Sequence, residues 1–228
     1  MLLYKFKSTL NLLHLLDIVV HERLYCPRYS DLNDPFEGQF RELLVDGGAV
    51  AVPPTPPRAT NFGTPNVLHV VYRDLMDLPL VQAIRVCSLT NRYDDVRMWS
   101  LYGDSHRGVA VEIDFDNYDH MPVEVRYDDC LPTGGAAELQ AKRPDEILAG
   151  KSNHWKYEAE YRLITAKVSM DIPGRVRRVL IGTRADEAVV KLLDKVMSPD
   201  IAMVRMKLVH GKVEVATGDL IPRTPRAG

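Results

Sequence analysis

The sequence has few cysteines, no long apolar run and no excess of either charge. Its three cysteines, Cys26, Cys87 and Cys130, form no C-x-x-C motif, which argues against a disulfide framework or a cysteine-rich zinc site and favours a reducing cytoplasm. A net charge of -2 provides no global basic field for nucleic acid or anionic lipid. The most apolar stretch, Leu10–Val20, is too short to span a bilayer. We therefore expect a cytoplasmic protein with no membrane partner.

The motifs that most often identify an enzyme from sequence are also missing. The chain contains no G-x-x-x-x-G-K-[ST], G-x-G-x-x-G, G-x-S-x-G or H-E-x-x-H. This removes the main support for P-loop, Rossmann, hydrolase and zincin assignments. The seven histidines are scattered, with no pair at the i, i+4 spacing of a helical metal site. We therefore expect no metal.

What is present is the composition of a folded protein, with 46% hydrophobic and 26% charged residues in 228. Proline and glycine predict a poorly ordered surface loop over residues 46–65. We expect one α+β domain over residues 1–218, built from two packed, mostly antiparallel sheets with flanking helices, and a flexible tail at 219–228. Hydrophobic patterning predicts strands at 2–7, 24–26, 84–89, 108–115, 123–127, 157–168, 176–182, 201–208 and 212–216, and helices at about 8–20, 67–76, 94–102, 136–148 and 187–197.

Three clusters of polar and aromatic residues are candidates for a functional site. In the first, around Asn33-Asp34-Pro35, local hydrogen bonding in a turn is the more ordinary role for Asn33. The second cluster covers residues 98–108. Its Trp99 is expected in the core, whereas Tyr102 and His106 fall at a helix end and in a loop, where polar side chains more often face a site. The third cluster covers residues 155–162.

On a strand, Glu158, Glu160 and Arg162 of the third cluster would share one face. Such a face is either a solvated ladder of charges or a functional line, and alternation alone favours the ladder. Two carboxylates at i, i+2 repel each other, however, and partial burial would raise the pKa of one of them. Glu160 is therefore the carboxylate of greatest interest.

Taken in order, these motifs resemble a widespread prokaryotic domain family of unknown function. The resemblance covers residues 2 to 208 and is carried by the segments LYKFKS (3–8 with Leu2 before them), DLNDPFEG (31–38), CSL (87–89), MWSLYG (98–103) with His106 and Gly108, and WKYEAEYRL (155–163). It names a family without an activity.

The chain is also similar, more distantly, to ADP-ribosyltransferases, especially the DNA-targeting toxins of the DarT type. In those enzymes a late-strand glutamate that follows an alanine is catalytic, as Glu160 follows Ala159 here. Cleavage of the nicotinamide–ribose bond builds positive charge on the ribose, which a nearby carboxylate stabilises. Those enzymes place His or Arg on the first strand, where this chain has Tyr4 and Lys5.

This resemblance implies an NAD-dependent ADP-ribosyltransferase-like protein, with NAD as its substrate. Its setting would be a toxin or an anti-phage defence component that modifies nucleic acid or protein. Glu160 is then the catalytic residue, and the NAD-binding residues are Tyr4, Lys5, Tyr25, Asn33, Tyr102 and His106. Tyr4, Asn33, Tyr102 and Glu160 are expected to converge on one pocket.

Two alternatives remain open from the sequence. One is a non-catalytic module of the same fold that binds a nucleotide or a partner. The other is a metal-dependent nuclease or phosphoesterase that uses Asp34, Glu37, Glu158 and Glu160, although no segment has the D-(x)n-E-x-K spacing of a nuclease.

Overall fold

A computed structural model describes residues 1–34, 38–45, 48–49, 68–74, 79–129 and 148–222. The chain divides into two compact units. Unit 1 consists of Met1–Pro27, Arg85–Glu124 and Tyr157–Gly228, and unit 2 consists of Arg28–Ile84 and Val125–Lys156. The α+β class is confirmed, because the chain has one large mixed sheet and few helices.

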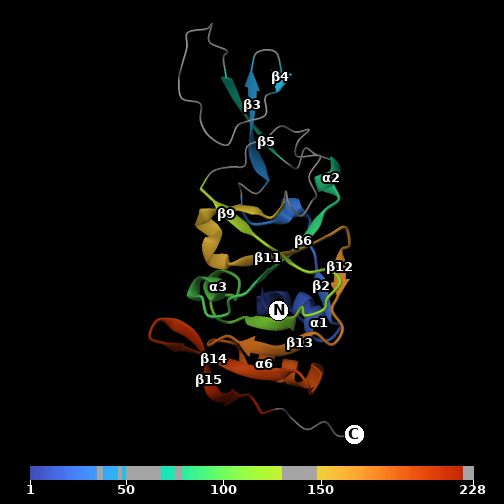
Figure 1. Cartoon of the computed structure of the whole chain (residues 1–228). Coiled ribbons are helices and arrows are strands. Elements are labelled where there is room, and N and C mark those ends of the chain that lie inside the picture. Colours follow the sequence, from blue (N-terminus) through green and yellow to red (C-terminus); the bar gives the residue numbers. More distant parts are fainter. Residues whose placement is uncertain (35–37, 46–47, 50–67, 75–78, 130–147, 223–228) are drawn as a thin grey trace. The chain divides into compact units, whose positions relative to one another are not determined.

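Unit 1 is built on an eight-stranded sheet with the strand order β15-β14-β13-β7-β1-β6-β11-β8 (Figure 1). Six of the seven strand pairs are antiparallel, and only β13 and β14 run parallel. The strands are β1 (Leu2–Lys7), β6 (Arg85–Thr90), β7 (Val109–Asp114), β8 (Val123–Glu124), β11 (Glu160–Thr165), β13 (Val176–Ile181), β14 (Ala202–Val209) and β15 (Lys212–Leu220).

The helices of unit 1 begin at polar side chains that cap free backbone N–H groups. The Asn11 side chain accepts a hydrogen bond from the amide of His14 at the start of α1, and Asp95 and Asp186 cap α3 and α6 in the same way. A short strand pair, β2 with β12, completes the unit. These elements are η1 (Thr9–Asn11), α1 (Leu12–Val19), α3 (Val96–Leu101), α6 (Glu187–Val196), β2 (Arg23–Tyr25) and β12 (Ser169–Asp171).

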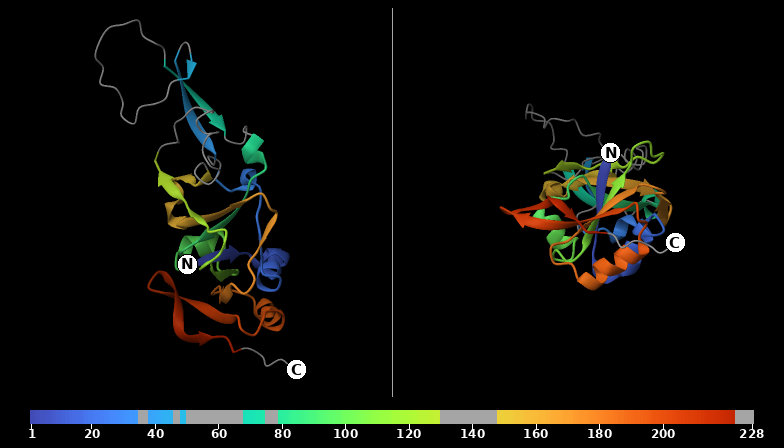
Figure 2. Two further views of the ribbon diagram at one scale, coloured as in Figure 1. Left: turned by 45° about the vertical axis from the view of Figure 1, so that its right-hand side comes forward. Right: turned by 90° about the horizontal axis from the view of Figure 1, so that it is seen from below.

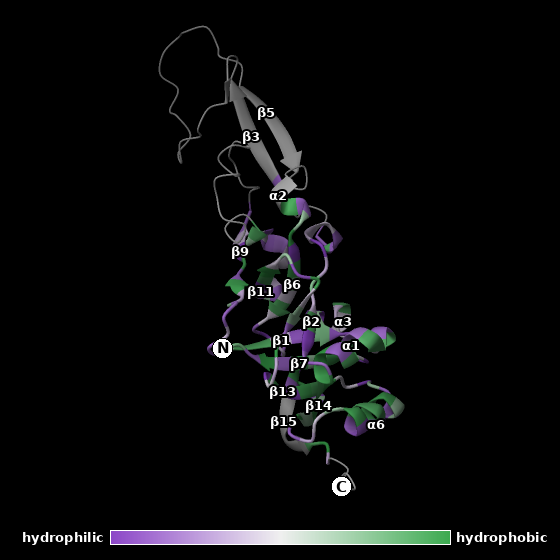
Figure 3. Cartoon of the chain, turned by 90° about the vertical axis from the view of Figure 1, so that its right-hand side faces the viewer, coloured by the Kyte–Doolittle hydropathy of each residue, from purple (hydrophilic) through white to green (hydrophobic). Residues whose placement is uncertain are grey.

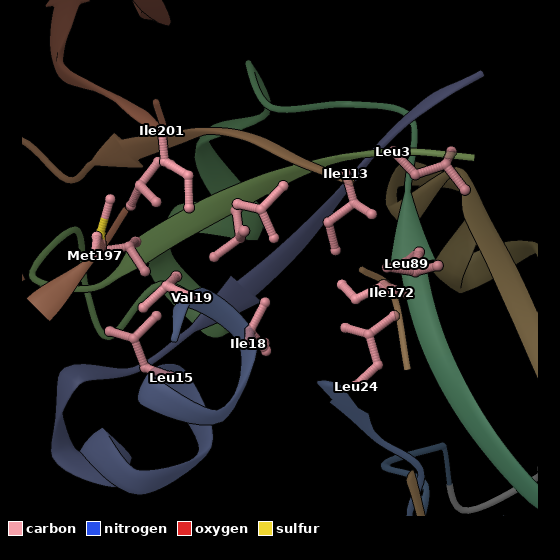
Figure 4. Close-up of a cluster of buried hydrophobic side chains, with 14 of the residues drawn as sticks. Leu3, Leu15, Ile18, Val19, Leu24, Leu89, Ile113, Ile172, Met197 and Ile201 are labelled. Carbon is pink, nitrogen blue, oxygen red and sulfur yellow. The ribbon is translucent and has the colours of Figure 1, made fainter. Parts of the chain in front are cut away.

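The main core of unit 1 lies on the face of the large sheet that α1 and α6 cover (Figure 2), and Figure 4 shows the part of it beside α1. Figure 3 shows that both helices carry hydrophobic and hydrophilic residues, as expected of helices with one buried face. No helix in the part of the chain that the structure describes could span a membrane. Buried residues of this core include Leu3, Leu15, Ile18, Leu89, Val111, Ile113, Leu163, Val179, Leu193 and Met203.

The opposite face of the sheet carries a second, smaller apolar cluster next to α3. The Phe6 and Trp99 rings meet edge to face at 5.0 Å between centroids. Further members come from β7, β13, β14 and β15, namely Ala110, Leu180, Val204, Met206 and Val213. Apolar packing on this face therefore covers the β1 to β15 half of the sheet.

The described residues of unit 2 include two small sheets and the short helical segments η2, α2 and part of η4. Strand β3 pairs antiparallel with β4 and β5, and β9 pairs parallel with β10. The elements are η2 (Tyr29–Asp31), β3 (Gln39–Val45), β4 (Gly48–Ala49), β5 (Leu68–Asp74), α2 (Pro79–Gln82), β9 (Arg126–Asp128), β10 (Gly150–Ser152) and η4 (Asn153–Glu158), the last of which ends in unit 1.

Three expected elements differ from the structure. The helix expected at 67–76 is wrong, because Leu68–Asp74 forms β5, whose β-branched Val70 and Val71 favour a strand. The strand expected at 157–168 begins only at Glu160, because η4 extends to Glu158 and Ala159 has a φ of 43°. The strand expected at 123–127 is divided into β8 and β9.

The sheet organisation also differs from the expectation of two packed sheets. In unit 1, a single eight-stranded sheet takes most of the strands, and helices α1 and α6 contribute much of the packing against its main core face. Residues 136–147 of the expected helix, most of the expected 46–65 loop and residues 223–228 of the tail lie outside the described residues. Gly48 and Ala49, inside that loop, form β4.

Candidate functional site

Five polar side chains form a line across five adjacent strands of the large sheet in unit 1. Arg178 on β13 is in register with Glu112 on β7, which is in register with Tyr4 on β1. Tyr4 is in register with Thr90 on β6, and Thr90 with Glu160 on β11. Residues in register on neighbouring strands point to the same face of a sheet. We call these five residues the polar row.

One end of the polar row is a hydrogen-bonded group of three side chains. The Tyr4 hydroxyl and the Arg178 Nε both donate to Oε2 of Glu112, each at 2.8 Å. Burial, followed by the hydrogen bond to Glu112, raises the pKa of Tyr4 far above its ordinary value. The hydrogen bond to Glu112 also raises the pKa of Arg178. Tyr4 therefore stays neutral and donates a hydrogen bond to a buried carboxylate.

The other end of the polar row is a buried ion pair. The Arg162 Nε and Nη2 donate to the two carboxylate oxygens of Glu160 at 2.9 and 3.1 Å. The side chain of Arg162 is fully buried and that of Glu160 is 4% exposed. A bidentate guanidinium contact favours the ionised carboxylate. The pairing is thus bidentate, with one guanidinium nitrogen on each carboxylate oxygen.

A second buried carboxylate, Glu158, precedes Glu160 by two residues. The hydroxyl of Tyr102, at the carboxyl-terminal end of α3, donates a hydrogen bond to Oε1 of Glu158. Next to it, the Arg97 guanidinium lies 4.3 Å from the centre of the Tyr157 ring and is paired with Asp95. Glu158 ends the helical segment η4 and Glu160 begins strand β11, and the chain changes direction between them at Ala159, which has a positive φ.

Aromatic rings border the polar row on the side of α3. The Tyr4 and Tyr93 rings are 5.2 Å apart, and the Trp99 indole N–H donates to the Tyr93 carbonyl at 2.6 Å. Trp99 is fully buried, as expected of a core residue. These contacts connect the loop that precedes α3 with β1, so the position of Tyr4 depends on the packing of that helix.

The structure brings together only part of the predicted NAD site. Tyr4 and Glu160 belong to the polar row, and Tyr102 bonds to Glu158 next to it. Asn33 lies in unit 2. The predicted pocket of Tyr4, Asn33, Tyr102 and Glu160 therefore stays a prediction.

Lys5 and Tyr25 point away from the polar row. Because side chains alternate along a strand, Lys5 projects to the face opposite Tyr4, where its Nζ donates to the Ser88 carbonyl at 2.6 Å. The Tyr25 ring stacks on His14 of α1 at 4.8 Å. Two of the residues expected to bind NAD are thus on the other side of the sheet from Glu160.

His106 lies behind Trp99, in the loop between α3 and β7. Its ring is parallel to the indole at 6.3 Å, and its Nε2 is 3.4 Å from the Ser100 hydroxyl. Its Nδ1 is buried without a hydrogen-bond partner. Burial, followed by the charge of Arg184, lowers the pKa of His106. This environment is that of a neutral histidine packed against an indole.

Sequence reasoning missed three members of the polar row: Thr90, Glu112 and Arg178. A signal existed for Glu112, the one charged residue within the apolar run from Val109 to Ile113. Its partners could be found only from the register, because Arg178 and Tyr4 are 66 and 108 residues away. Searches with protein-family models, against curated proteins and against solved structures find no match to this chain.

Within the described ranges, no three His, Cys, Asp or Glu side chains gather as the ligands of a metal ion would. The carboxylates of the polar row are instead bonded to guanidinium and hydroxyl groups. The polar row thus presents two carboxylates, each bonded to a guanidinium group, and a neutral phenol on one face of a sheet.

Proposed function

We propose that this protein is an NAD-dependent ADP-ribosyltransferase and that the polar row of unit 1 forms part of its active site. The observation that carries the proposal is the buried Glu160 carboxylate, paired with Arg162 and in register with Thr90 and Tyr4 on one sheet face. Buried ionisable groups are costly to a fold and are concentrated at functional sites.

The proposed role of Glu160 follows from the charge that develops in the reaction. As the bond between nicotinamide and ribose breaks, positive charge builds on the ribose, and a preorganised anion beside it lowers the barrier. The guanidinium of Arg162 favours the anionic form of this carboxylate. In the proposed reaction, Glu160 accepts a hydrogen bond from a ribose hydroxyl and then the proton of the acceptor.

Tyr4 and Tyr102 are the proposed aromatic contacts of the nicotinamide half of NAD. Their hydroxyl groups are each held by a carboxylate, Glu112 and Glu158 respectively. Rings fixed in this way lose little conformational entropy when a ligand stacks on them. The acceptor would be a nucleic acid or a protein, in keeping with a toxin or an anti-phage defence component.

A non-catalytic nucleotide-binding module is the second candidate. It is favoured by the fact that both oxygens of Glu160 already accept hydrogen bonds from Arg162, in a side chain that is only 4% exposed. A carboxylate in that position can serve the fold alone. The two candidates predict different results in the same experiment.

The test measures NAD⁺ binding by calorimetry, NAD⁺ consumption and melting temperature for the wild type and Glu160→Gln. For a transferase, we expect a loss of about 2–4 kcal/mol of transition-state stabilisation, a decrease of roughly 30- to 1,000-fold in turnover. Glu187→Gln is the matched control, because Glu187 is exposed on α6. It should leave turnover unchanged.

Three outcomes separate the candidates. Binding of NAD⁺ with turnover that depends on Glu160 supports the transferase. Binding without turnover in the wild type supports the binding module. A protein in which Glu160→Gln lowers only the melting temperature, with turnover per folded molecule equal to the wild type, contradicts the catalytic role of Glu160.

A further inference from the structure

Two buried cysteines of unit 1 lie next to each other in space, 61 positions apart in the sequence. Cys26 follows β2 and Cys87 is in the middle of β6. Both are free thiols with no exposed surface. Neither belongs to the polar row, because Cys87 points to the face of the sheet opposite Ser88 and Thr90.

The backbone places these two residues opposite each other. The Val86 amide donates to the Pro27 carbonyl at 2.9 Å, and in unit 2 the Tyr29 amide donates to the Ile84 carbonyl at 3.3 Å. Both bonds fit one antiparallel register, in which Cys26 faces Cys87. The return bond, from the nitrogen of residue 27 to the Val86 carbonyl, cannot form because Pro27 has no N–H group.

In that register Cys26 and Cys87 form a non-hydrogen-bonded pair. Such pairs have Cα atoms about 4.5 Å apart, with their side chains closer than in the alternate pairs. A disulfide accepts Cα separations of about 4.4–6.8 Å. The backbone is therefore already positioned for a bond between the two sulfur atoms.

The side chains agree with this placement. The interaction between the two sulfur atoms lowers the pKa of Cys87 and raises that of Cys26, and the Cys26 Sγ donates to the Leu24 carbonyl at 3.6 Å. Burial acts against the lowering at Cys87, whereas the ammonium groups of Lys5 and Lys7 on β1 reinforce it. The pair thus consists of one sulfur that favours the thiolate and a neighbouring thiol in contact with it.

We propose that Cys26 and Cys87 form a redox-active dithiol, which a peroxide converts reversibly to a disulfide. The Cys87 thiolate attacks one oxygen of hydrogen peroxide, the O–O bond breaks, and the departing hydroxide takes up the proton that Cys87 released on ionisation, so that a sulfenic acid and one water form. The Cys26 sulfur then attacks the sulfenic sulfur, the S–S bond forms, and a second water leaves. Two thiols lose two electrons and the peroxide gains them. A dithiol reductant reverses the change.

The disulfide would connect β6 to the segment that follows β2. Strand β6 carries Thr90 of the polar row on its other face, between Tyr4 and Glu160. The oxidation site and the polar row are therefore on opposite faces of the same strand. The dithiol proposal does not depend on the transferase activity.

The test uses hydrogen peroxide on the folded Cys130→Ser variant, which retains only the two thiols of interest. We expect both thiols to disappear together, the chain mass to fall by two hydrogen atoms, and proteolysis to release one linked pair of peptides containing Cys26 and Cys87. Dithiothreitol should restore both thiols. The linked peptides can also be measured in the wild-type chain, so the result does not depend on the folding of any variant.

Cys26→Ser in the Cys130→Ser background is the matched control. Without its partner, Cys87 should give a sulfenic acid that dimedone traps, and no linked peptides. The proposal is overturned if both thiols persist at peroxide concentrations that oxidise the chain in denaturant. It is equally overturned if the linked peptides join Cys130 or two different chains instead of Cys26 and Cys87.

Discussion

The two faces of the large sheet in unit 1 are built from the same strands but carry different chemistry. On β7, Val109, Val111 and Ile113 enter the main core, whereas Glu112 between them belongs to the polar row. The main core face is filled largely by aliphatic side chains, and the other buries two carboxylates and a guanidinium. Aliphatic packing stabilises a fold directly, but buried charges do so only while paired. Stability alone therefore does not explain why the residues of the polar row are present on this face.

The largest effect is expected when one partner of the buried ion pair is removed. Arg162→Met leaves the Glu160 carboxylate buried without its counter-charge. The free energy of unfolding should fall by about 3–5 kcal/mol, as measured by urea denaturation. The control is Arg177→Met, since Arg177 pairs with Asp114 at a side-chain exposure of 54% and should contribute no more than about 1 kcal/mol. Equal losses in the two variants would contradict the assigned difference.

A cavity on the apolar face should have a slightly smaller effect. Leu15 of α1 is fully buried in the main core, and Leu15→Ala should lower the free energy of unfolding by about 2–5 kcal/mol. Leu13→Ala on the same helix is the matched control, because Leu13 is 78% exposed. It should change stability by about 0.5 kcal/mol or less. A large loss at Leu13 would mean that the face of α1 assigned to the core is wrong.

One lysine on the apolar face should make stability depend on pH. Burial, and then the charge of Lys5, lowers the pKa of Lys7 from 10.5 to about 8. Between these values the unfolded chain retains a proton that the folded chain has released, so the free energy of unfolding should rise with pH, by up to about 3 kcal/mol. Lys7→Met should remove this rise and stabilise the protein at pH 7. A pH profile identical in wild type and variant would contradict the prediction.

The smallest effect is expected at the neutral member of the polar row. Tyr4→Phe removes one hydroxyl donor to Glu112, while Arg178 still pairs with that carboxylate. The free energy of unfolding should fall by about 1 kcal/mol. NAD⁺ affinity, measured by calorimetry on the same variant, shows whether the hydroxyl also serves a ligand. A decrease of more than about 3 kcal/mol in the free energy of unfolding would contradict this prediction and would mean that Tyr4 is needed mainly for the fold.

Many local elements could be predicted from the sequence because their signals are local. The strand at Leu2–Lys7 and the helix that begins after Asp186 were found from alternation, apolar spacing and a capping side chain. The helix expected over 67–76 was wrong because the same apolar residues fit a strand when β3 is available to pair with them. The intrinsic preference of a segment for helix or strand does not show whether a partner strand is available to pair with it.

The candidate site was also predicted only in part, because some of its residues have a signal in the nearby sequence and others do not. Glu160 stood out by its neighbours in the sequence and Tyr4 by its first-strand position in the resemblance to ADP-ribosyltransferases, and the structure puts both on one sheet face. Lys5 was assigned with Tyr4, but alternation along a strand turns its side chain to the other face. Thr90 and Arg178 have no local signal, and only the strand order brings them into the polar row.

The sequence by itself determined where most of the strands and capped helices of unit 1 form, because apolar periodicity and capping act over a few residues. It also determined that Glu160 and Arg162 have the spacing to share one face of a strand. Tertiary structure alone decided which charges are buried and with what partners. Glu112 receives Tyr4 and Arg178 from distant positions, and Cys26 faces Cys87 across an antiparallel pairing. The physical reason is that register between strands is set by the packing of a whole sheet face, which no short segment encodes.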